Sequence, residues 1–71
     1  MYLLLSSIAE GNPKKLVNMA LVSEGVPHKQ GQRSFTTLVV PSAVDPAERY
    51  VNVTESPGHI AEMIDAKLKG R

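Results

Sequence analysis

Residues 56–70 read SPGHIAEMIDAKLKG, and this stretch carries the most complete set of local folding signals in the 71-residue chain. Ser56 is a favoured N-cap, because its hydroxyl can accept a hydrogen bond from a backbone N–H in the first turn of a helix. Pro57 suits the first helical position, where its fixed φ matches the helix. Gly70 is a typical residue to end a helix. Lys67 and Lys69 come just before it, where the negative end of the helix dipole stabilises cations. We therefore predict a C-terminal helix that begins near Ser56.

The apolar residues of this stretch recur at helical spacing. Ile60, Ile64 and Leu68 lie four residues apart, so they form one stripe along the helix. Asp65 and Lys69 lie one turn apart and can form an ion pair on the solvent side. The helix is thus predicted to be amphipathic and to cover an apolar surface formed by the rest of the chain.

That surface is predicted to be an antiparallel sheet. Residues 33–40 form the clearest strand, because they are rich in β-branched side chains that suit a half-buried sheet, and Pro41 ends the run. Residues 50–54 alternate in polarity, with Val51 and Val53 expected to point inward. The strand of residues 50–54 leads directly into the predicted helix.

The first half of the chain is predicted to supply two further strands, over residues 2–8 and 16–22, separated by the break Gly11-Asn12-Pro13. In the second of them, Val17, Met19 and Leu21 are expected to face the core. A helix over residues 14–22 is the competing interpretation, because the apolar residues there also fit one helical face.

Two polar stretches connect these elements. Residues 23–33 contain Gly25, Pro27 and Gly31 and read as a loop, and residues 42–48 read as a connection. Short connections favour an antiparallel meander over a parallel sheet. The predicted fold class is α+β, with a small antiparallel sheet of about four strands and one C-terminal amphipathic helix, in a single domain over residues 1–71.

The amino-acid composition excludes disulfides and some metal sites as sources of stability for the folded chain. The chain has no cysteine, which excludes disulfides and zinc sites built on thiolates. Its two histidines, His28 and His59, lie in no recognised ligand spacing, so no metal or other cofactor is expected. A domain of this size buries only roughly 60% of the surface that its unfolded chain exposes. A partner chain is therefore expected to add stability.

The apolar start of the chain is too short to cross a bilayer, which takes about 20 residues. It also lacks the basic region and the long apolar core of a signal peptide. No membrane association is therefore expected, and the expected location is the cytoplasm.

An enzymatic function is not expected. The chain has neither a G-x-S-x-G elbow nor a glycine-rich phosphate loop. A serine nucleophile needs an oriented base, and Ser56 and His59 are close in sequence. A helix cap explains both residues, so no catalytic residue is assigned.

A resemblance comes from residues 50–60, which read YVNVTESPGHI. Together with the residues up to Ile64 they resemble the end of the small FlbD-like flagellar and phage proteins, in which a strand runs through a V-x-E-S stop into a helix with spaced isoleucines. The matching residues are Val53, Glu55, Ser56, Ile60 and Ile64. This specific match covers about a fifth of the chain, which departs from the family by its stretches 23–33 and 42–48.

The compact, cysteine-free format is also similar to small lytic-phage proteins that bind bacterial RNA polymerase, inhibit initiation and promote antitermination. This second resemblance implies a protein–protein inhibitor that acts in the host cytoplasm. Its contacts would lie in the N-terminal strand and the adjoining loops.

The leading functional prediction is a small non-enzymatic regulator that docks on a larger protein, with bacterial RNA polymerase as the favoured target. Two leucines are expected to supply apolar contact area, and four cations are expected to steer the protein toward an acidic surface. These six residues are Leu3, Leu5, Lys14, Lys15, Lys29 and Arg33.

Two alternatives remain open. A nucleic-acid-binding module would use the basic loop of residues 28–33, with aromatic side chains as stacking platforms. The net charge of only +1 argues against it, because phosphate binding scales with clustered cations. A self-associating assembly protein or homodimer would use the first strand, which is expected to lie at a sheet edge.

Overall fold

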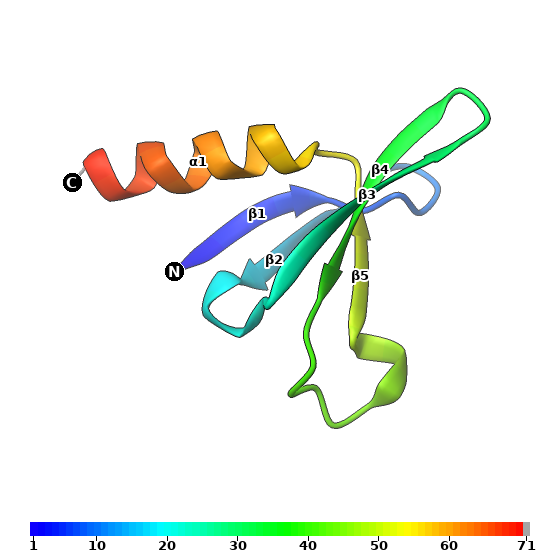
Figure 1. The fold of residues 1–71 in the computed structure, drawn as a ribbon, viewed down its shortest axis with the longest axis horizontal. Helices are drawn as coiled ribbons and strands as arrows, with labels where there is room; N and C mark the ends of the chain where they lie inside the picture. Colours follow the sequence, from blue (N-terminus) through cyan, green and yellow to red (C-terminus); the bar gives the residue numbers. More distant parts are fainter. Residues whose placement is uncertain (71) are drawn as a thin grey trace.

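The structure is a computed structural model that describes residues 1–70, and within that range it contains five strands and one α-helix (Figure 1). The strands are β1 (Tyr2–Ser6), β2 (Lys14–Asn18), β3 (Glu24–Gln30), β4 (Arg33–Val39) and β5 (Tyr50–Val53). Two 3-10 turns, η1 (Met19–Leu21) and η2 (Pro46–Glu48), interrupt the connections, and the helix is α1 (Pro57–Lys69). The predicted α+β class is confirmed, with five strands where about four were expected.

The strands form two small antiparallel sheets. β1 pairs with β2, and β4 lies between β3 and β5. A bridge between Ser7 and Val53 joins the two sheets, and the backbone N–H of Thr54 donates to the carbonyl of Ser6 at 2.8 Å. The chain leaving β1 therefore passes from one sheet to the other and makes a corner between them.

The core lies in the angle between the two sheets, where α1 closes one side (Figure 1). Four strands and the helix each contribute to it. Its buried members are Leu3, Leu5, Val17, Leu38, Val53 and Ile60. Because burying one such side chain stabilises a fold by about 1.5–3 kcal/mol, this small set carries much of the stability.

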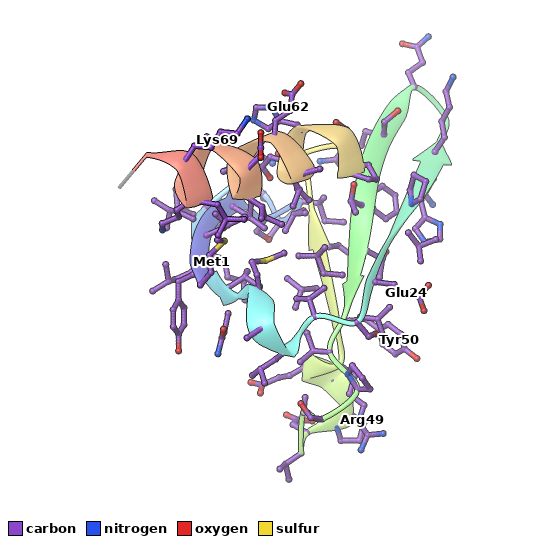
Figure 2. All side chains as sticks on the ribbon, turned by 60° about the vertical axis from the view of Figure 1, so that its left-hand side comes forward. Met1, Glu24, Arg49, Tyr50, Glu62 and Lys69 are labelled. Carbon is purple, nitrogen blue, oxygen red and sulfur yellow. The ribbon has the colours of Figure 1, made fainter. Side chains whose placement is uncertain are left out.

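The helix begins as predicted. The backbone N–H of His59 donates to the Ser56 hydroxyl at 3.0 Å, and Asp65 pairs with Lys69 at 3.0 Å. Figure 2 shows Lys69 and Glu62 on the side of α1 that faces away from the sheets. The N-terminal end of α1 is therefore capped, and its last turn carries lysines, as the sequence indicated. Gly70 follows the helix at φ −88°, outside the left-handed region that a glycine cap typically adopts.

The apolar stripe of α1 is only partly buried. Ile60 is buried, Ile64 is half-buried and Leu68 is exposed. The helix runs on past the start of β1, so its last turn has no sheet beneath it (Figure 1). No helix within residues 1–70 is long and apolar enough to cross a membrane.

The predicted loop over residues 23–33 is wrong, because most of it is β3. β3 is an edge strand, where Pro27 is tolerated since its missing N–H can face away from the neighbouring strand. Gly25 gives room to the core: a Cβ there would lie 3.3 Å from a methyl carbon of Leu38. Gly31, at φ +63°, opens the two-residue turn that leads into β4.

The prediction for residues 16–22 is correct only at its start. The strand ends at Asn18, because the side-chain oxygen of Asn18 accepts from the N–H of Ala20 at 3.1 Å and caps η1. Val17 is buried as expected, but Leu21 is half exposed. The competing helix over residues 14–22 is also wrong, since η1 is a single 3-10 turn.

Candidate functional site

The two faces of the β1–β2 hairpin differ sharply in burial. Leu3, Leu5 and Val17 point into the core. The opposite face, here called the outer hairpin face, consists of Tyr2, Leu4, Ser6, Lys14, Leu16 and Asn18. Leu4 lies directly opposite Leu16, and the two leucines are 53% and 63% exposed. An apolar cross-strand pair is therefore presented to solvent.

This arrangement corrects the apolar part of the predicted contact surface. Leu3 and Leu5 are 4% and 0% exposed, so their side chains have almost no area to offer a partner. Successive residues of a strand point to opposite faces, and the apolar run of the first strand does not reveal which set is buried. The apolar side chains that a partner can reach on this hairpin are those of Tyr2, Leu4 and Leu16.

Two of the predicted cations lie close to this face. The Lys14 ammonium donates to the hydroxyl of Ser6 at 2.9 Å. The guanidinium of Arg33 donates to the carbonyl of Ile8 at 3.2 Å, although Arg33 comes from the other sheet. Lys14 therefore stands on the outer hairpin face beside Leu16, whereas Arg33 binds the chain two residues past the end of β1.

The other two predicted cations lie elsewhere. Lys15 follows Lys14 in β2, and its side chain points to the opposite face. It borders a hollow of about 230 Å³ along β2, which Leu16 lines from the same strand and Glu48 and Val51 line from across the hollow. Lys29 lies near the tip of the β3–β4 hairpin, which projects from the body of the protein (Figure 1). The six predicted residues therefore do not form one site.

The projecting hairpin carries a second candidate surface. The rings of His28 and Phe35, which are opposite each other in the register, stack with centroids 5.3 Å apart. Lys29 and Ser34 border a shallow hollow of about 270 Å³ that reaches the start of α1 at Pro57. His28 is exposed and Phe35 is half-buried, and an aromatic pair of this kind beside a cation suits a flat ring or a nucleotide base.

Glu55 makes a long-range contact that the sequence did not indicate. Both of its carboxylate oxygens accept from the backbone N–H of Ser6, at 3.0 and 3.1 Å. Burial raises the pKa of Glu55, but the hydrogen bonds from the Ser6 and Glu55 backbone and the charge of Lys14 outweigh it, so the pKa lies below its ordinary value. No local pattern links residue 55 to residue 6, since only the corner between the sheets brings them together.

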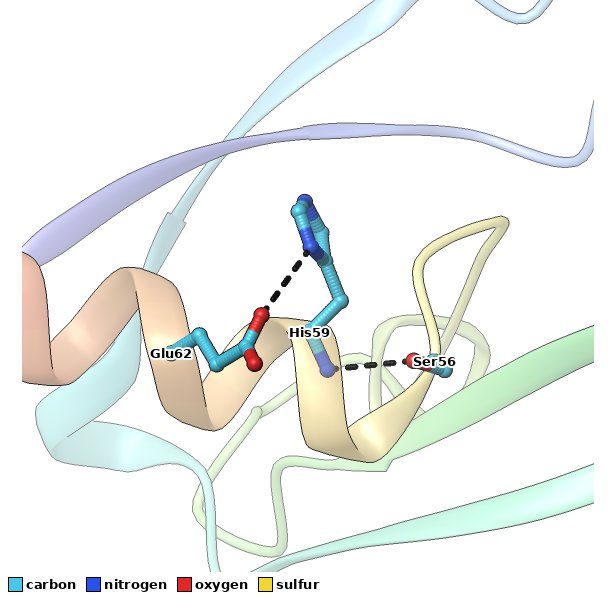
Figure 3. Close-up of polar contacts among 3 residues, drawn as sticks. All are labelled: Ser56, His59 and Glu62. Carbon is cyan, nitrogen blue, oxygen red and sulfur yellow. Dashed lines mark hydrogen bonds and ion pairs between the residues drawn. The ribbon is translucent and has the colours of Figure 1, made fainter.

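Ser56 and His59 have the geometry of a helix cap (Figure 3). The Ser56 hydroxyl binds the backbone N–H of His59, and the imidazole is turned toward Glu62, with 3.8 Å between Nδ1 and Oε1. The imidazole of His59 is thus not directed at the Ser56 hydroxyl. Among residues 1–70, no three His, Asp or Glu side chains lie close enough together to hold a metal ion.

No protein-family model matches the chain, and no match was found among curated proteins or among solved structures. The resemblance to the FlbD-like proteins stays a prediction.

Proposed function

We propose that this protein is a small non-enzymatic regulator that binds a larger protein through its outer hairpin face. The observation that carries the proposal is the exposed pair of Leu4 and Leu16, with Lys14 beside it. Interfaces typically have an apolar centre and a polar rim, and this face has both. The favoured target is bacterial RNA polymerase in the cytoplasm. Binding would inhibit initiation of transcription or promote antitermination.

The two parts of the surface would contribute differently. Burying Leu4 and Leu16 against a partner would supply most of the affinity, at about 1.5–3 kcal/mol for each fully buried leucine. Lys14 and Arg33 would mainly raise the rate of association with an acidic surface, an effect that salt screens. The matching partner surface is an apolar depression with acidic residues around it.

The test is binding of the immobilised protein to purified bacterial RNA polymerase. Leu4→Asp places a charge in the proposed contact, and we expect it to weaken binding about tenfold or more. Val44→Asp is the matched control, because Val44 is 95% exposed in the loop between β4 and η2. Equal binding by the two variants would show that the outer hairpin face is not part of the contact. If the wild-type protein did not bind, RNA polymerase would be excluded as the target.

The stacked pair of His28 and Phe35 favours one second candidate, a nucleic-acid-binding module at the β3–β4 hairpin. In that case affinity for single-stranded DNA would fall steeply with salt and would be lost in a Lys29→Ala/Arg33→Ala variant. Leu4→Asp would leave that affinity unchanged. The two candidates therefore separate on one set of variants.

A further inference from the structure

β2 has an open backbone edge. The N–H of Ser7 donates to the carbonyl of Pro13 at 2.9 Å, and the N–H of Met19 donates to the carbonyl of Met1 at 2.8 Å. These bonds fix the phase of the antiparallel pair, so Lys15 and Val17 direct their backbone groups toward β1. The alternate residues of β2 direct their N–H groups away from β1. These residues are Lys14, Leu16 and Asn18.

Within residues 1–70, nothing hydrogen-bonds to the outward backbone groups of Lys14 and Leu16 or to the N–H of Asn18. A partner strand could satisfy them. Such an unpaired row is a template for pairing with another strand.

The free sides of the other outer strands are partly occupied. On the free side of β5, the N–H of Ile8 donates to the carbonyl of Asn52 at 3.3 Å. On the free side of β1, the carboxylate of Glu55 binds the N–H of Ser6, and the ammonium of Lys67 binds the carbonyl of Tyr2 at 2.6 Å. The outer edge of β3 contains Pro27, which has no N–H to offer. The first strand was expected to be the open edge, and the structure moves that role to β2 because Glu55 and α1 occupy the far side of β1.

We infer that the β2 strands of two copies pair antiparallel, with the two-fold axis at Leu16. In this register Leu16 faces the partner's Leu16, and each exchanges N–H and C=O bonds with the other. Lys14 faces the partner's Asn18, and Lys15 faces the partner's Val17. No lysine faces a lysine in this register. The repulsion between like charges that are directly opposite each other across a strand pair is therefore avoided.

The same pairing joins the two outer hairpin faces. Leu4 is already opposite Leu16 within one copy. Across the axis, Leu16 continues the row to the partner's Leu16 and Leu4, which gives one apolar row of four leucines. A contact of this kind closes on itself, because each copy uses its β2 edge once. Strands of five residues make a small interface, so we expect a weak and reversible dimer.

Cysteine trapping tests the register, because the chain has no cysteine of its own. At a hydrogen-bonded antiparallel pair the Cα atoms lie about 5.5 Å apart, within reach of a disulfide, so Leu16→Cys should cross-link to itself. Lys14→Cys should not, because its counterpart lies about 13 Å away along the partner strand. Val44→Cys reports random collision, since Val44 is almost fully exposed.

Under mild oxidation we expect Leu16→Cys to form covalent dimers about tenfold or more faster than the other two variants, since association holds its thiols at high effective concentration. Equal rates for all three variants would overturn the inference. Circular dichroism of the reduced proteins verifies that each variant is folded.

Sedimentation equilibrium provides the second measurement. The wild-type protein should show an average mass that rises with concentration, and Leu16→Lys, which places two ammonium groups face to face, should remain a monomer. Val44→Lys should behave as the wild type. A wild-type protein that stays monomeric at every concentration would refute the dimer. Neither measurement involves the proposed target, so the dimer and the regulatory function can fail separately.

Discussion

At the scale of single residues, the charged side chain of Glu55 connects parts of the chain that are 49 residues apart. The carboxylate of Glu55 accepts from the N–H of Ser6. The Thr36 hydroxyl donates to the backbone carbonyl of Glu55 at 2.6 Å. The folded protein thus holds Glu55 in its charged form at the corner where the two sheets meet. Since its pKa is lowered on folding, Glu55 stabilises the fold at pH values above the ordinary glutamate pKa. That contribution is lost as the pH falls through the lowered pKa.

We therefore predict that Glu55→Gln destabilises the protein at neutral pH by about 1 kcal/mol, the difference between a charged and a neutral acceptor. The difference between wild type and variant should shrink and vanish in acid. Urea unfolding at a series of pH values measures it. Glu10→Gln, an exposed residue of the β1–β2 turn, serves as the control and should change stability little at any pH. A pH-independent difference for Glu55→Gln would show that the charge of Glu55 contributes nothing.

At the scale of elements, the two-residue turn at Gly31 decides the register of β3 against β4. Gly31 has φ +63°, a conformation that costs about 1–2 kcal/mol for a residue with a side chain. We predict that Gly31→Ala lowers the free energy of unfolding by about that amount. The loss should appear in thermal or urea unfolding, because the strand pair β3–β4 depends on this turn.

Gly58 provides the matched control for this prediction. It lies in the first turn of α1, and a Cβ added there meets no atom within 4 Å. Gly58→Ala should therefore be neutral or stabilise the protein by up to about 1 kcal/mol, because alanine loses less backbone entropy in a helix. If the two substitutions had equal effects, the positive φ of Gly31 would not be the cause.

At the scale of the whole molecule, stability depends on a core of few side chains. Leu5 is fully buried between the sheets and α1, whereas its neighbour Leu4 is more than half exposed. We predict that Leu5→Ala lowers the free energy of unfolding by about 2–5 kcal/mol. Leu4→Ala should change it by no more than about 0.5 kcal/mol. Chemical unfolding followed by circular dichroism compares the two.

This pair of substitutions also separates folding from binding. If Leu4→Ala weakened binding of the target while leaving stability intact, the outer hairpin face would be supported. If Leu5→Ala changed binding but not stability, Leu5 would be a contact residue as the sequence first suggested, and the assignment of the core would be refuted.

Sequence alone determined the elements whose signals are local. The cap at Ser56, the first part of the stripe on α1 and the strand before it were correctly predicted, because each depends on residues within one or two turns. The edge strand β3 was missed, since Gly25 and Pro27 are loop signals whose meaning changes when a neighbouring strand is present.

Only the tertiary structure decided which residues are available to a partner. The run Tyr2-Leu3-Leu4-Leu5 is apolar throughout, and the position of α1 and of the second sheet selects which alternate residues are covered. The same packing brought Glu55 to Ser6 and Lys67 to Tyr2, and so occupied the free side of β1 while leaving the outward N–H groups of β2 unpaired. Burial and edge pairing depend on contacts between distant parts of the chain, and local patterns carry no information about those contacts.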